Sequence, residues 1–536
     1  IFERNHWDWC YHAYRSGVSW DIELPEDRRE SKRQPVTARL QLLQRYWSKN
    51  LRQETAMAPA QLPPHLKFEV IPSSVSWHAI QLPHFAPPVP AYDLSSLLHR
   101  PAGKYGFVTT GEDGHFHYAD GKRARFWGVA IQDGTVAPEH DSAERFAANL
   151  ALNGCNMVRF HLFDWYLAAA LAEEKTGKLS PENAQRLDRF DYLIDCLKKN
   201  GIYLYLDLND SQSKMQKMHK SAFLWSRELR DNQKEYARLL LNRTGHYTGT
   251  RLVEDPMMAM VEIINESSFW WNSPPENAEP QQRDELQAEW NRWLRRKYHD
   301  QEQLVQSWRA LSCAVPPHAD LARADLPLCD PHENPDFSRF CYEVTCTYYR
   351  EMRDFLRNEL GVKVPITGHN SPFSAPDLAA LARETDFIST HFYWSTAANS
   401  TLDSCLEDFW NLLPQIAASK VKGKPLLVTE YNAPAPNPYR AEAVPILIAS
   451  LLSQDIDGVI FFNYAAFSGK ASFEKWPDAI WNFRFLPNDP LQWGQFAWGA
   501  AAFFNRYLQP NPGVTEVVMD EEDRKSTRLN SSHDQI

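Results

Sequence analysis

Residues 258–266 read MAMVEIINE, and residues 425–432 read PLLVTEYN. Each stretch is a short apolar run that leads into polar residues, with Glu266 closing the first and Glu430 near the end of the second. A parallel strand that is buried on both faces requires a continuous apolar run of this kind. Both stretches are therefore predicted to be parallel strands that carry a carboxylate at the carboxyl end.

The chain alternates between strand and helix patterns from residue 124 onward. Eight strands are predicted, at residues 124–131, 156–163, 202–209, 257–266, 362–369, 387–394, 426–431 and 458–464. Connections long enough for a helix specify either a closed (β/α)₈ barrel or an open, doubly wound sheet. Because no glycine-rich phosphate loop follows the first strand, we predict an α/β fold of the closed (β/α)₈ TIM-barrel type.

Helix signals lie between these strands. Ser180 is a predicted N-cap, Pro181 stands at the first helical position, and Gly201 ends the same helix. Further helices are predicted at residues 141–152, at residues 492–508 and, as a pair, within residues 282–311. The pair is an insertion in the fourth connection, and it favours a walled site that acts on chain ends or short substrates.

Composition divides the chain into four segments. Residues 1–50 show a strand, loop and helix pattern that resembles the tail of another barrel or a cap on this one. Residues 51–100 are rich in proline, which is typical of a linker. Residues 101–510 form the predicted barrel, and an N-terminal β-hairpin is expected near its start, between Tyr105 and Phe126. Residues 511–536 form a tail that resembles translated adapter sequence from about residue 523.

Charge and cysteine content exclude several kinds of partner. The formal net charge is −11, and no basic cluster is long enough to follow a phosphate backbone, so nucleic acid is not expected to bind. No apolar run approaches the ~20 residues of a membrane span.

The eight cysteines and the scattered histidines show no metal-ligand spacing, so neither a metal nor another cofactor is predicted. A disulfide between Cys313 and Cys329, the oligomeric state and the compartment stay open, and a secreted or periplasmic location is compatible with the sequence.

Two carboxylates at the carboxyl ends of barrel strands indicate cleavage of a glycosidic bond. One carboxyl gives a proton to the leaving oxygen, and the other attacks the anomeric carbon from the opposite face. A retaining enzyme holds the two about 5 Å apart, which barrel strands can arrange. An asparagine beside the acid, here Asn265, can donate a hydrogen bond to the 2-hydroxyl of the sugar. The expected partner is therefore a neutral carbohydrate.

Around these residues the chain resembles glycoside hydrolase clan A, and most of all the cellulase-like enzymes of glycoside hydrolase family five. The resemblance implies that Glu266 is the acid/base and Glu430 the nucleophile. It also implies that Arg159 steadies the nucleophile, and that His391 and Tyr393 form a His-x-Tyr pair whose tyrosine contacts it. A cation and a hydroxyl donor favour the ionised form of a carboxyl, whereas Glu266 would need a raised pKa from burial and from the nearby second carboxylate.

The chain departs from the family pattern at three positions. Ser267 follows the acid where the family has proline, Asn209 ends the third strand where histidine is common, and Asn463 replaces the usual tryptophan at the eighth. Because of these three changes, the sequence does not determine which sugar is the substrate. Glu262, inside the fourth strand, is expected to make a structural ion pair. The third strand also carries Asp207 and Asp210 at its end, to which we assign no role.

Further substrate-binding candidates are His161, Trp270, Trp271 and Trp394. His161 lies two residues after Arg159 in the same predicted strand, so both side chains are expected on the same face. A histidine buried in the core would fit this position equally well. The tryptophans follow the fourth and sixth strands, where an indole ring could stack on a sugar or pack in the core.

The predicted function is that of a retaining β-glycoside hydrolase, which cleaves neutral β-linked hexose oligosaccharides or polysaccharides by double displacement. A transglycosylase would use the same carboxylates. A non-catalytic carbohydrate-binding barrel is the third alternative. A separation of the two glutamates well beyond about 5–6 Å would indicate either binding alone or an inverting enzyme.

Overall fold

The computed structural model describes residues 92–210, 219–272, 275–311, 313–316, 320–372, 374–394, 404, 406, 416–433, 437, 439–466 and 485–519. Eight strands form one sheet in the order β7-β6-β5-β4-β3-β10-β9-β8, and every neighbouring pair is parallel. The strands are β3 (Phe126–Gln132), β4 (Met157–His161), β5 (Tyr203–Asp207), β6 (Met258–Glu262), β7 (Ile366–Thr367), β8 (Ile388–Tyr393), β9 (Leu426–Asn432) and β10 (Gly458–Ala466). Each lies within or overlaps one of the eight predicted strands.

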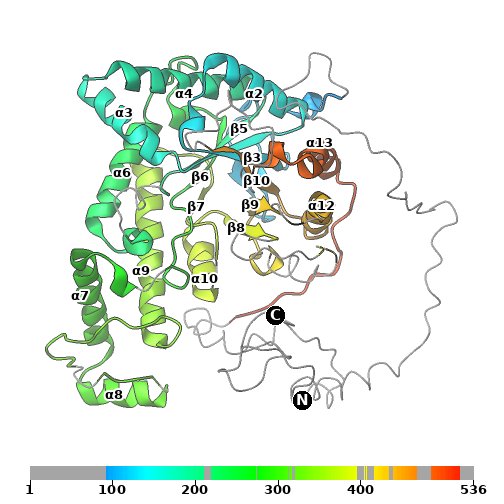
Figure 1. The fold of residues 1–536 in the computed structure, drawn as a ribbon. Helices are drawn as coiled ribbons and strands as arrows, with labels where there is room; N and C mark the ends of the chain where they lie inside the picture. The colour runs from blue at the N-terminus through cyan, green and yellow to red at the C-terminus, as the bar shows by residue number, and fades with distance from the viewer. Residues whose placement is uncertain are drawn as a thin grey trace, which may run out of the picture. The chain divides into compact units, whose positions relative to one another are not determined.

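The two end strands of this sheet, β7 and β8, also meet. The backbone N–H of Asp386 donates to the carbonyl of Ile366 at 2.8 Å, and the hydroxyl of Thr367 donates to the carbonyl of Phe387 at 3.0 Å. These contacts bring the first and last strands together, so the sheet curves into a barrel (Figure 1). The predicted (β/α)₈ fold is confirmed.

Helices lie outside the strands (Figure 1). They are α2 (His140–Leu152), α3 (Asp164–Thr176), α4 (Pro181–Lys199), α6 (Arg227–Leu241), α7 (Pro280–Lys297), α8 (Gln301–Ala310), α9 (Pro335–Asp354), α10 (Ala375–Glu384), α12 (Ala443–Ser453) and α13 (Pro490–Phe504). Shorter helical turns are η2 (Ser95–Leu97), η3 (Asp133–Val136), η4 (Lys220–Leu224), η5 (Leu252–Glu254), η6 (Pro275–Asn277), η7 (Phe355–Glu359), η8 (Arg440–Glu442) and η9 (Leu486–Asn488). Among the described helices, none is both long and apolar enough to cross a membrane.

Local sequence signals explain several helix boundaries. The Ser180 side chain accepts a hydrogen bond from the N–H of Asn183 at the start of α4, as its position predicted. Gly201, just after the end of α4, has a φ of 80°, a conformation that glycine adopts without strain. The two helices predicted in the fourth connection are α7 and α8. Trp290 of α7 packs against Phe337 and Phe340 of α9, so this insertion is anchored to the outer helical layer (Figure 1).

The predicted hairpin covers the amino-terminal end of the barrel. It consists of β1 (Thr109–Thr110) paired antiparallel with β2 (Phe116–His117). Phe116 is fully buried, and its ring lies 6.0 Å from that of Phe126 and 5.2 Å from that of Phe387, which stand at the starts of β3 and β8. Close packing continues at Gly458, where a Cβ atom would lie 2.2 Å from the carbonyl oxygen of Phe126. The carboxyl ends of the strands are therefore the end that can hold a site.

Several sequence predictions fall outside the described residues. These are the segment 1–50, residues 51–91 of the predicted linker and residues 520–536 of the tail. Of the cysteines that are described, Cys155 and Cys196 are buried thiols, as expected. Cys313 and Cys329 are not joined to each other by a disulfide.

Candidate active site

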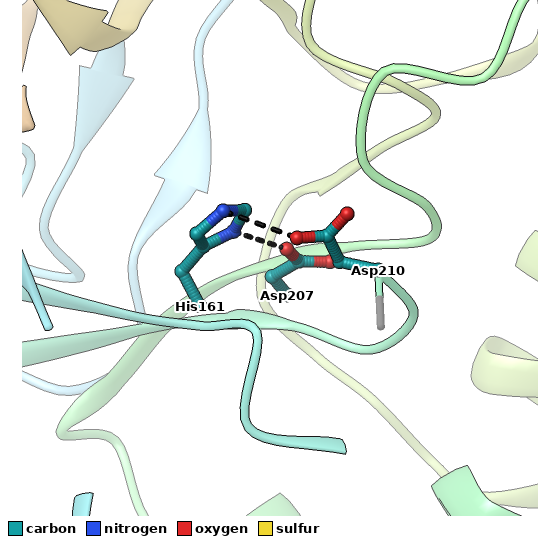
Figure 2. Close-up of side chains that lie close together, drawn as sticks. All are labelled: His161, Asp207 and Asp210. Carbon is teal, nitrogen blue, oxygen red and sulfur yellow. Dashed lines mark hydrogen bonds and ion pairs between the residues drawn. The ribbon is translucent and has the colours of Figure 1, made fainter. Parts of the chain in front are cut away.

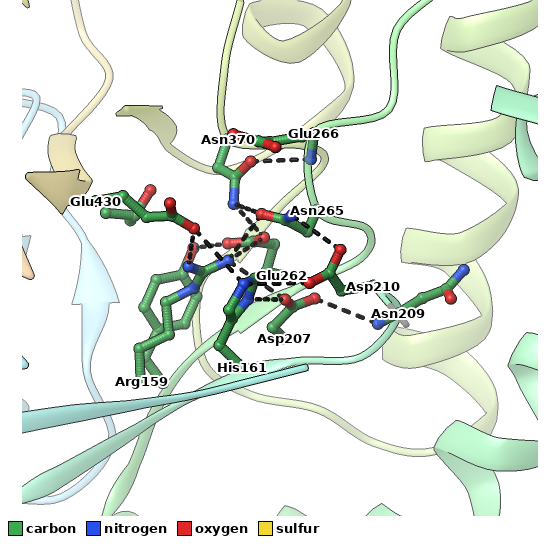
Figure 3. A network of polar contacts seen from close by, with 12 residues as sticks. Arg159, His161, Asp207, Asn209, Asp210, Glu262, Asn265, Glu266, Asn370 and Glu430 are labelled. Atoms are coloured by element: carbon green, nitrogen blue, oxygen red, sulfur yellow. Dashed lines mark hydrogen bonds and ion pairs between the residues drawn. The ribbon is translucent and has the colours of Figure 1, made fainter. Parts of the chain in front are cut away.

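Arg159 of β4 stands at the centre of the polar network at the carboxyl ends of the strands (Figure 3). Its side chain is completely buried. Nη1 donates to Oε1 of Glu430 at 2.7 Å, and Nη2 donates to Oε1 of Glu262 at 2.9 Å and to Oδ1 of Asn265 at 3.1 Å. The ion pair predicted for Glu262 is therefore present. One guanidinium connects both strands that carry the predicted carboxylates.

Glu430 of β9 is held by several donors. Besides Arg159, the hydroxyl of Tyr393 donates to its Oε2. Two imidazoles lie somewhat further from Oε1, with Nε2 of His391 at 3.5 Å and Nε2 of His161 at 3.8 Å. A cation and a hydroxyl donor both stabilise a carboxylate, so the surroundings of Glu430 suit a negatively charged group.

Glu266 follows β6 and approaches the same space from the other side. Its backbone has a φ of 44°, and its N–H donates to Oδ1 of Asn370 at 3.0 Å. Nδ1 of His391 lies 2.9 Å from its Oε1, and Nζ of Lys220 lies 3.7 Å from its Oε2. A carboxylate oxygen of Glu266 and one of Glu430 lie within 4.8 Å of each other. The structure thus brings the two predicted carboxylates together.

The expected rise in the pKa of Glu266 is wrong for this structure. Burial raises the pKa, but the hydrogen bond and charge of His391, together with the charge of Lys220, outweigh burial and lower it to about 2. From the sequence, His391 was predicted only as a member of the His-x-Tyr pair, and no role was predicted for Lys220, which lies on η4 outside the recognised motifs. The carboxyl of Glu266 is therefore ionised at neutral pH when no substrate is bound.

Asn370 is a site residue that the sequence analysis missed. It follows β7 and is fully buried. Its Nδ2 donates to Oε1 of Glu262 at 2.5 Å and to Oδ1 of Asn265 at 2.6 Å, while its Oδ1 accepts the N–H of Glu266 (Figure 3). The only signal in the sequence was its place just beyond the fifth predicted strand. One amide thus joins the loop of Glu266 to the network around Arg159.

Asp207 and Asp210, to which no role was assigned, hold His161 in place (Figure 2). Nδ1 of His161 lies 2.7 Å from Oδ2 of Asp207, and Nε2 lies 3.1 Å from Oδ2 of Asp210. Burial and the charge of Arg159 lower the pKa of His161 to about 3, and burial raises the pKa of Asp207 to about 7. The imidazole is therefore neutral, and it is fixed between two carboxyl groups.

Comparison with known proteins identifies the family of the chain. The family model of glycoside hydrolase 42, described as β-galactosidase, matches residues 138–481, which is more than half of the chain. This chain belongs to glycoside hydrolase family 42. It is therefore a glycosidase of clan A, as the sequence indicated, whereas membership of family five is not confirmed. No curated protein matches the chain.

Solved structures similar to this family 42 chain include an endo-1,4-β-mannanase from Rhizomucor miehei. It is 16% identical, with 74% of this chain and 99% of that chain covered and a TM-score of 0.48. A β-galactosidase from the psychrophilic Marinomonas ef1 is 16% identical over 71% of this chain and 59% of its own, with a TM-score of 0.48. A β-glucanase from Saccharophagus degradans is 15% identical over 78% and 98%, with a TM-score of 0.43.

The tryptophans of the family 42 chain differ in exposure. Trp270 is buried, and its indole N–H donates to the hydroxyl of Ser338 at 3.2 Å, so it serves packing. Trp394 is only 9% exposed, and its backbone N–H donates to the carbonyl of Asn432. Trp271 is 47% exposed. Of the three predicted platforms, Trp271 alone presents a large accessible ring.

Two of the three departures from the clan pattern make structural contacts near the predicted acid. The hydroxyl of Ser267 donates to the carbonyl of Lys220 at 3.3 Å, and the carbonyl of Asn209 accepts the N–H of Asn265 at 3.0 Å. Asn463 is buried on β10. Ser267 and Asn209 thus tie the loop of the predicted acid to its neighbours and leave both predicted carboxylates in place.

Two groups of described side chains bring possible metal ligands within 4.8 Å of one another: His161 with Asp207 and Asp210, and Glu266 with His391 and Glu430. Both groups already contact cationic side chains. Nη2 of Arg159 lies 3.3 Å from the first group, and Nζ of Lys220 lies 3.5 Å from the first and 3.7 Å from the second. These cations compensate the carboxylates, and we assign no metal to either group.

Proposed function

We propose that this protein is a retaining β-glycosidase in which Glu430 is the nucleophile and Glu266 the acid/base. The supporting observation is the distance of at most 4.8 Å between one carboxylate oxygen of each residue. Retaining glycosidases hold the two carboxyl groups about 5–5.5 Å apart, while inverting enzymes need about 6.5–9.5 Å to admit a water molecule. The short separation favours direct attack by Glu430.

In the first step, Glu430 attacks the anomeric carbon, and the bond to the leaving oxygen breaks as that oxygen takes a proton from Glu266. Arg159 and Tyr393 donate hydrogen bonds to the attacking carboxylate and fix its direction. In the second step, Glu266 removes a proton from water, and the water oxygen displaces Glu430 from the sugar with retention of configuration.

The acid step needs a proton on Glu266, although its pKa is about 2 in the free protein. Its side chain is 23% exposed, so a sugar bound over it removes water from the carboxylate and raises the pKa. Nδ1 of His391, 2.9 Å from Oε1, is placed to pass on a proton. The Glu266–His391 pair, rather than an isolated glutamic acid, then carries the acid function.

We infer that the substrate is a neutral β-linked hexoside, and a β-galactoside is the first choice because the matching family is described as β-galactosidase. The resemblance to cellulase-like enzymes adds β-glucosides to the set. Transglycosylation would proceed from the same glycosyl–enzyme, so only product analysis separates it from hydrolysis. A barrel that only binds sugar would have no need for two carboxylates held at catalytic separation.

The proposal is tested with aryl β-D-galactosides and β-D-glucosides, together with Glu430→Ala, Glu266→Ala and, as a control, Glu182→Ala. Glu182 is 83% exposed on α4, so its removal should leave turnover unchanged. We expect both site variants to lose turnover, and azide to restore glycosyl azide formation with opposite anomeric configurations in the two. An initial α-configured product from the wild type, followed by NMR, would show inversion and refute the mechanism.

A further inference from the structure

We propose that Lys220 and Asp210 form a hydroxyl-binding pair: Lys220 donates hydrogen bonds to neighbouring hydroxyl groups of an uncharged sugar beside Glu266, and Asp210, buried behind it, holds the ammonium group in place. The inference rests on the proposed glycosidase function and extends it, because neither residue belongs to the catalytic pair. It starts from the position of one ammonium group. Lys220 begins η4, and Asp210 lies just beyond β5.

The ammonium group of Lys220 is surrounded by carboxylates but bonded to none. Nζ lies 3.5 Å from Oδ1 of Asp210 and 3.7 Å from Oε2 of Glu266, longer than the usual 2.7–3.2 Å of an N–H···O hydrogen bond. In the part of the chain that the structure describes, no side chain accepts a closer contact from it. The Lys220 side chain is 22% exposed, so water can reach its N–H groups. A sugar that displaced this water without replacing its hydrogen bonds would leave a buried ammonium unsatisfied, at considerable cost.

Both members of the pair are fixed relative to the catalytic residues. Asp210 receives a hydrogen bond at 3.0 Å from Nδ2 of Asn265, the amide expected to contact the sugar. Lys220 is tied to the loop of Glu266, because its carbonyl accepts the hydroxyl of Ser267. The buried carboxylate of Asp210, which also lies 3.1 Å from Nε2 of His161, therefore fixes the position of the partly exposed ammonium close to the predicted acid.

This arrangement selects an uncharged ligand. The ammonium lies between the carboxylates of Asp210 and Glu266, so a third negative charge, such as that of a uronic acid, would be repelled. A hydroxyl group can accept a hydrogen bond from Lys220, and the three N–H donors of the ammonium can serve two adjacent hydroxyls at once. The chemistry fits a vicinal diol of a neutral sugar.

Lys220→Met tests the proposal, since methionine has a similar length and neither charge nor donor. Lys234→Met is the matched control, because Lys234 is a partly buried lysine that pairs with Glu351 outside the site. The assay measures kcat/KM on an aryl β-galactoside and on its 2-, 3-, 4- and 6-deoxy analogues, with the leaving group kept constant. We expect Lys220→Met to lower kcat/KM on the parent sugar about 10- to 100-fold. On at least one deoxy analogue the wild type and the variant should be equally slow.

An equal loss on every analogue, together with a shift of the pH profile, would mean that Lys220 only adjusts the acidity of Glu266, and would overturn the proposal. If the wild type cleaved no glycoside, the catalytic proposal would fail while the binding proposal stayed testable. Calorimetric titration with D-galactose and lactose would then decide it. Weaker binding by Lys220→Met supports the pair, whereas equal binding, or none by the wild type, refutes it.

Discussion

Asn370→Ala should separate the positioning of Glu266 from its chemistry. The amide of Asn370 accepts the N–H of Glu266 at 3.0 Å, and its other end donates to Asn265 and Glu262. Glu266 has a φ of 44°, a region that costs a non-glycine residue roughly 1–2 kcal/mol. Without the acceptor, the backbone loses the hydrogen bond that holds it there, and the carboxyl group spends part of its time away from the leaving oxygen.

The size of the effect follows from the hydrogen bonds that the substitution removes. Removal of the acceptor leaves the N–H of Glu266 without its partner, which costs about 1–3 kcal/mol. If this energy is lost from the conformation that holds the Glu266 carboxyl near the leaving oxygen, that conformation becomes less populated. Protonation of the leaving group should then slow by about 10- to 100-fold, since 1.4 kcal/mol corresponds to a factor of ten. The substitution also removes the hydrogen bonds that Asn370 donates to Asn265 and Glu262, which should lower the stability further.

The assay compares kcat/KM for two β-galactosides, because this ratio reports the step in which the first leaving group departs. A dinitrophenol departs without a proton, whereas a sugar or alkyl alcohol needs one. Asn370→Ala should therefore strongly lower kcat/KM on the β-galactoside with a sugar or alkyl leaving group, and should leave kcat/KM nearly normal on the dinitrophenyl β-galactoside. Asn156→Ala is the matched control, since Asn156 is a buried amide before β4 that bonds to Trp127 and Arg125. An equal loss on both leaving groups would refute the positioning role.

Three further predictions concern the same network and the opposite end of the barrel. Tyr393→Phe removes the hydroxyl that donates to Glu430 and should lower kcat/KM about 10-fold or more while the melting temperature is nearly unchanged; full activity would contradict this role. Arg159→Met leaves Glu430 and Glu262 buried without their cation and should reduce the free energy of unfolding by about 3–5 kcal/mol, measured in urea; a change below about 1 kcal/mol would contradict the ion-pair argument. Burial alone would lower the pKa of His115, but hydrogen bonds to Asp455 and Asp457 raise it to about 9. Its contribution to stability is therefore complete below about pH 6.5 and is lost as the pH rises through 9, by up to roughly 3 kcal/mol, and His115→Gln should abolish this slope.

The barrel could be predicted because its strands are continuous apolar runs. In β3, β4, β5, β6 and β9 every residue is buried, so hydrophobicity alone marks them. The short strand β7 was predicted as residues 362–369 but pairs only at Ile366 and Thr367. Its limits depend on which backbone groups meet β6, and no sequence pattern expresses that register.

The carboxylates and their main partners were also visible in the sequence, because each stands at the end of a strand next to residues of a recognisable motif. The roles of Asn370, Lys220, Asp207 and Asp210 could not be predicted. Their roles arise from distances across the barrel, such as the 2.7 Å between His161 and Asp207, which lie on different strands. The predicted rise in the pKa of Glu266 was wrong for the same reason, because His391 and Lys220, which come from another strand and a loop, lower that pKa.

The charges of the site support the proposal of a neutral substrate. Within the described residues, the carboxyl groups of Asp207, Asp210, Glu262, Glu266 and Glu430 meet around the cations of Arg159 and Lys220. Carboxyl groups thus outnumber permanent cations, although burial raises the pKa of Asp207 to about 7 and that of Glu262 well above its ordinary value, so that protons on these two groups reduce the difference. Glycoside cleavage passes through a transition state with positive charge at the anomeric carbon. Negative groups fixed before the reaction stabilise that charge without further reorganisation, whereas they gain little from a neutral ground state. The same surplus would repel an anionic sugar, so the network favours both the chemistry and the class of substrate.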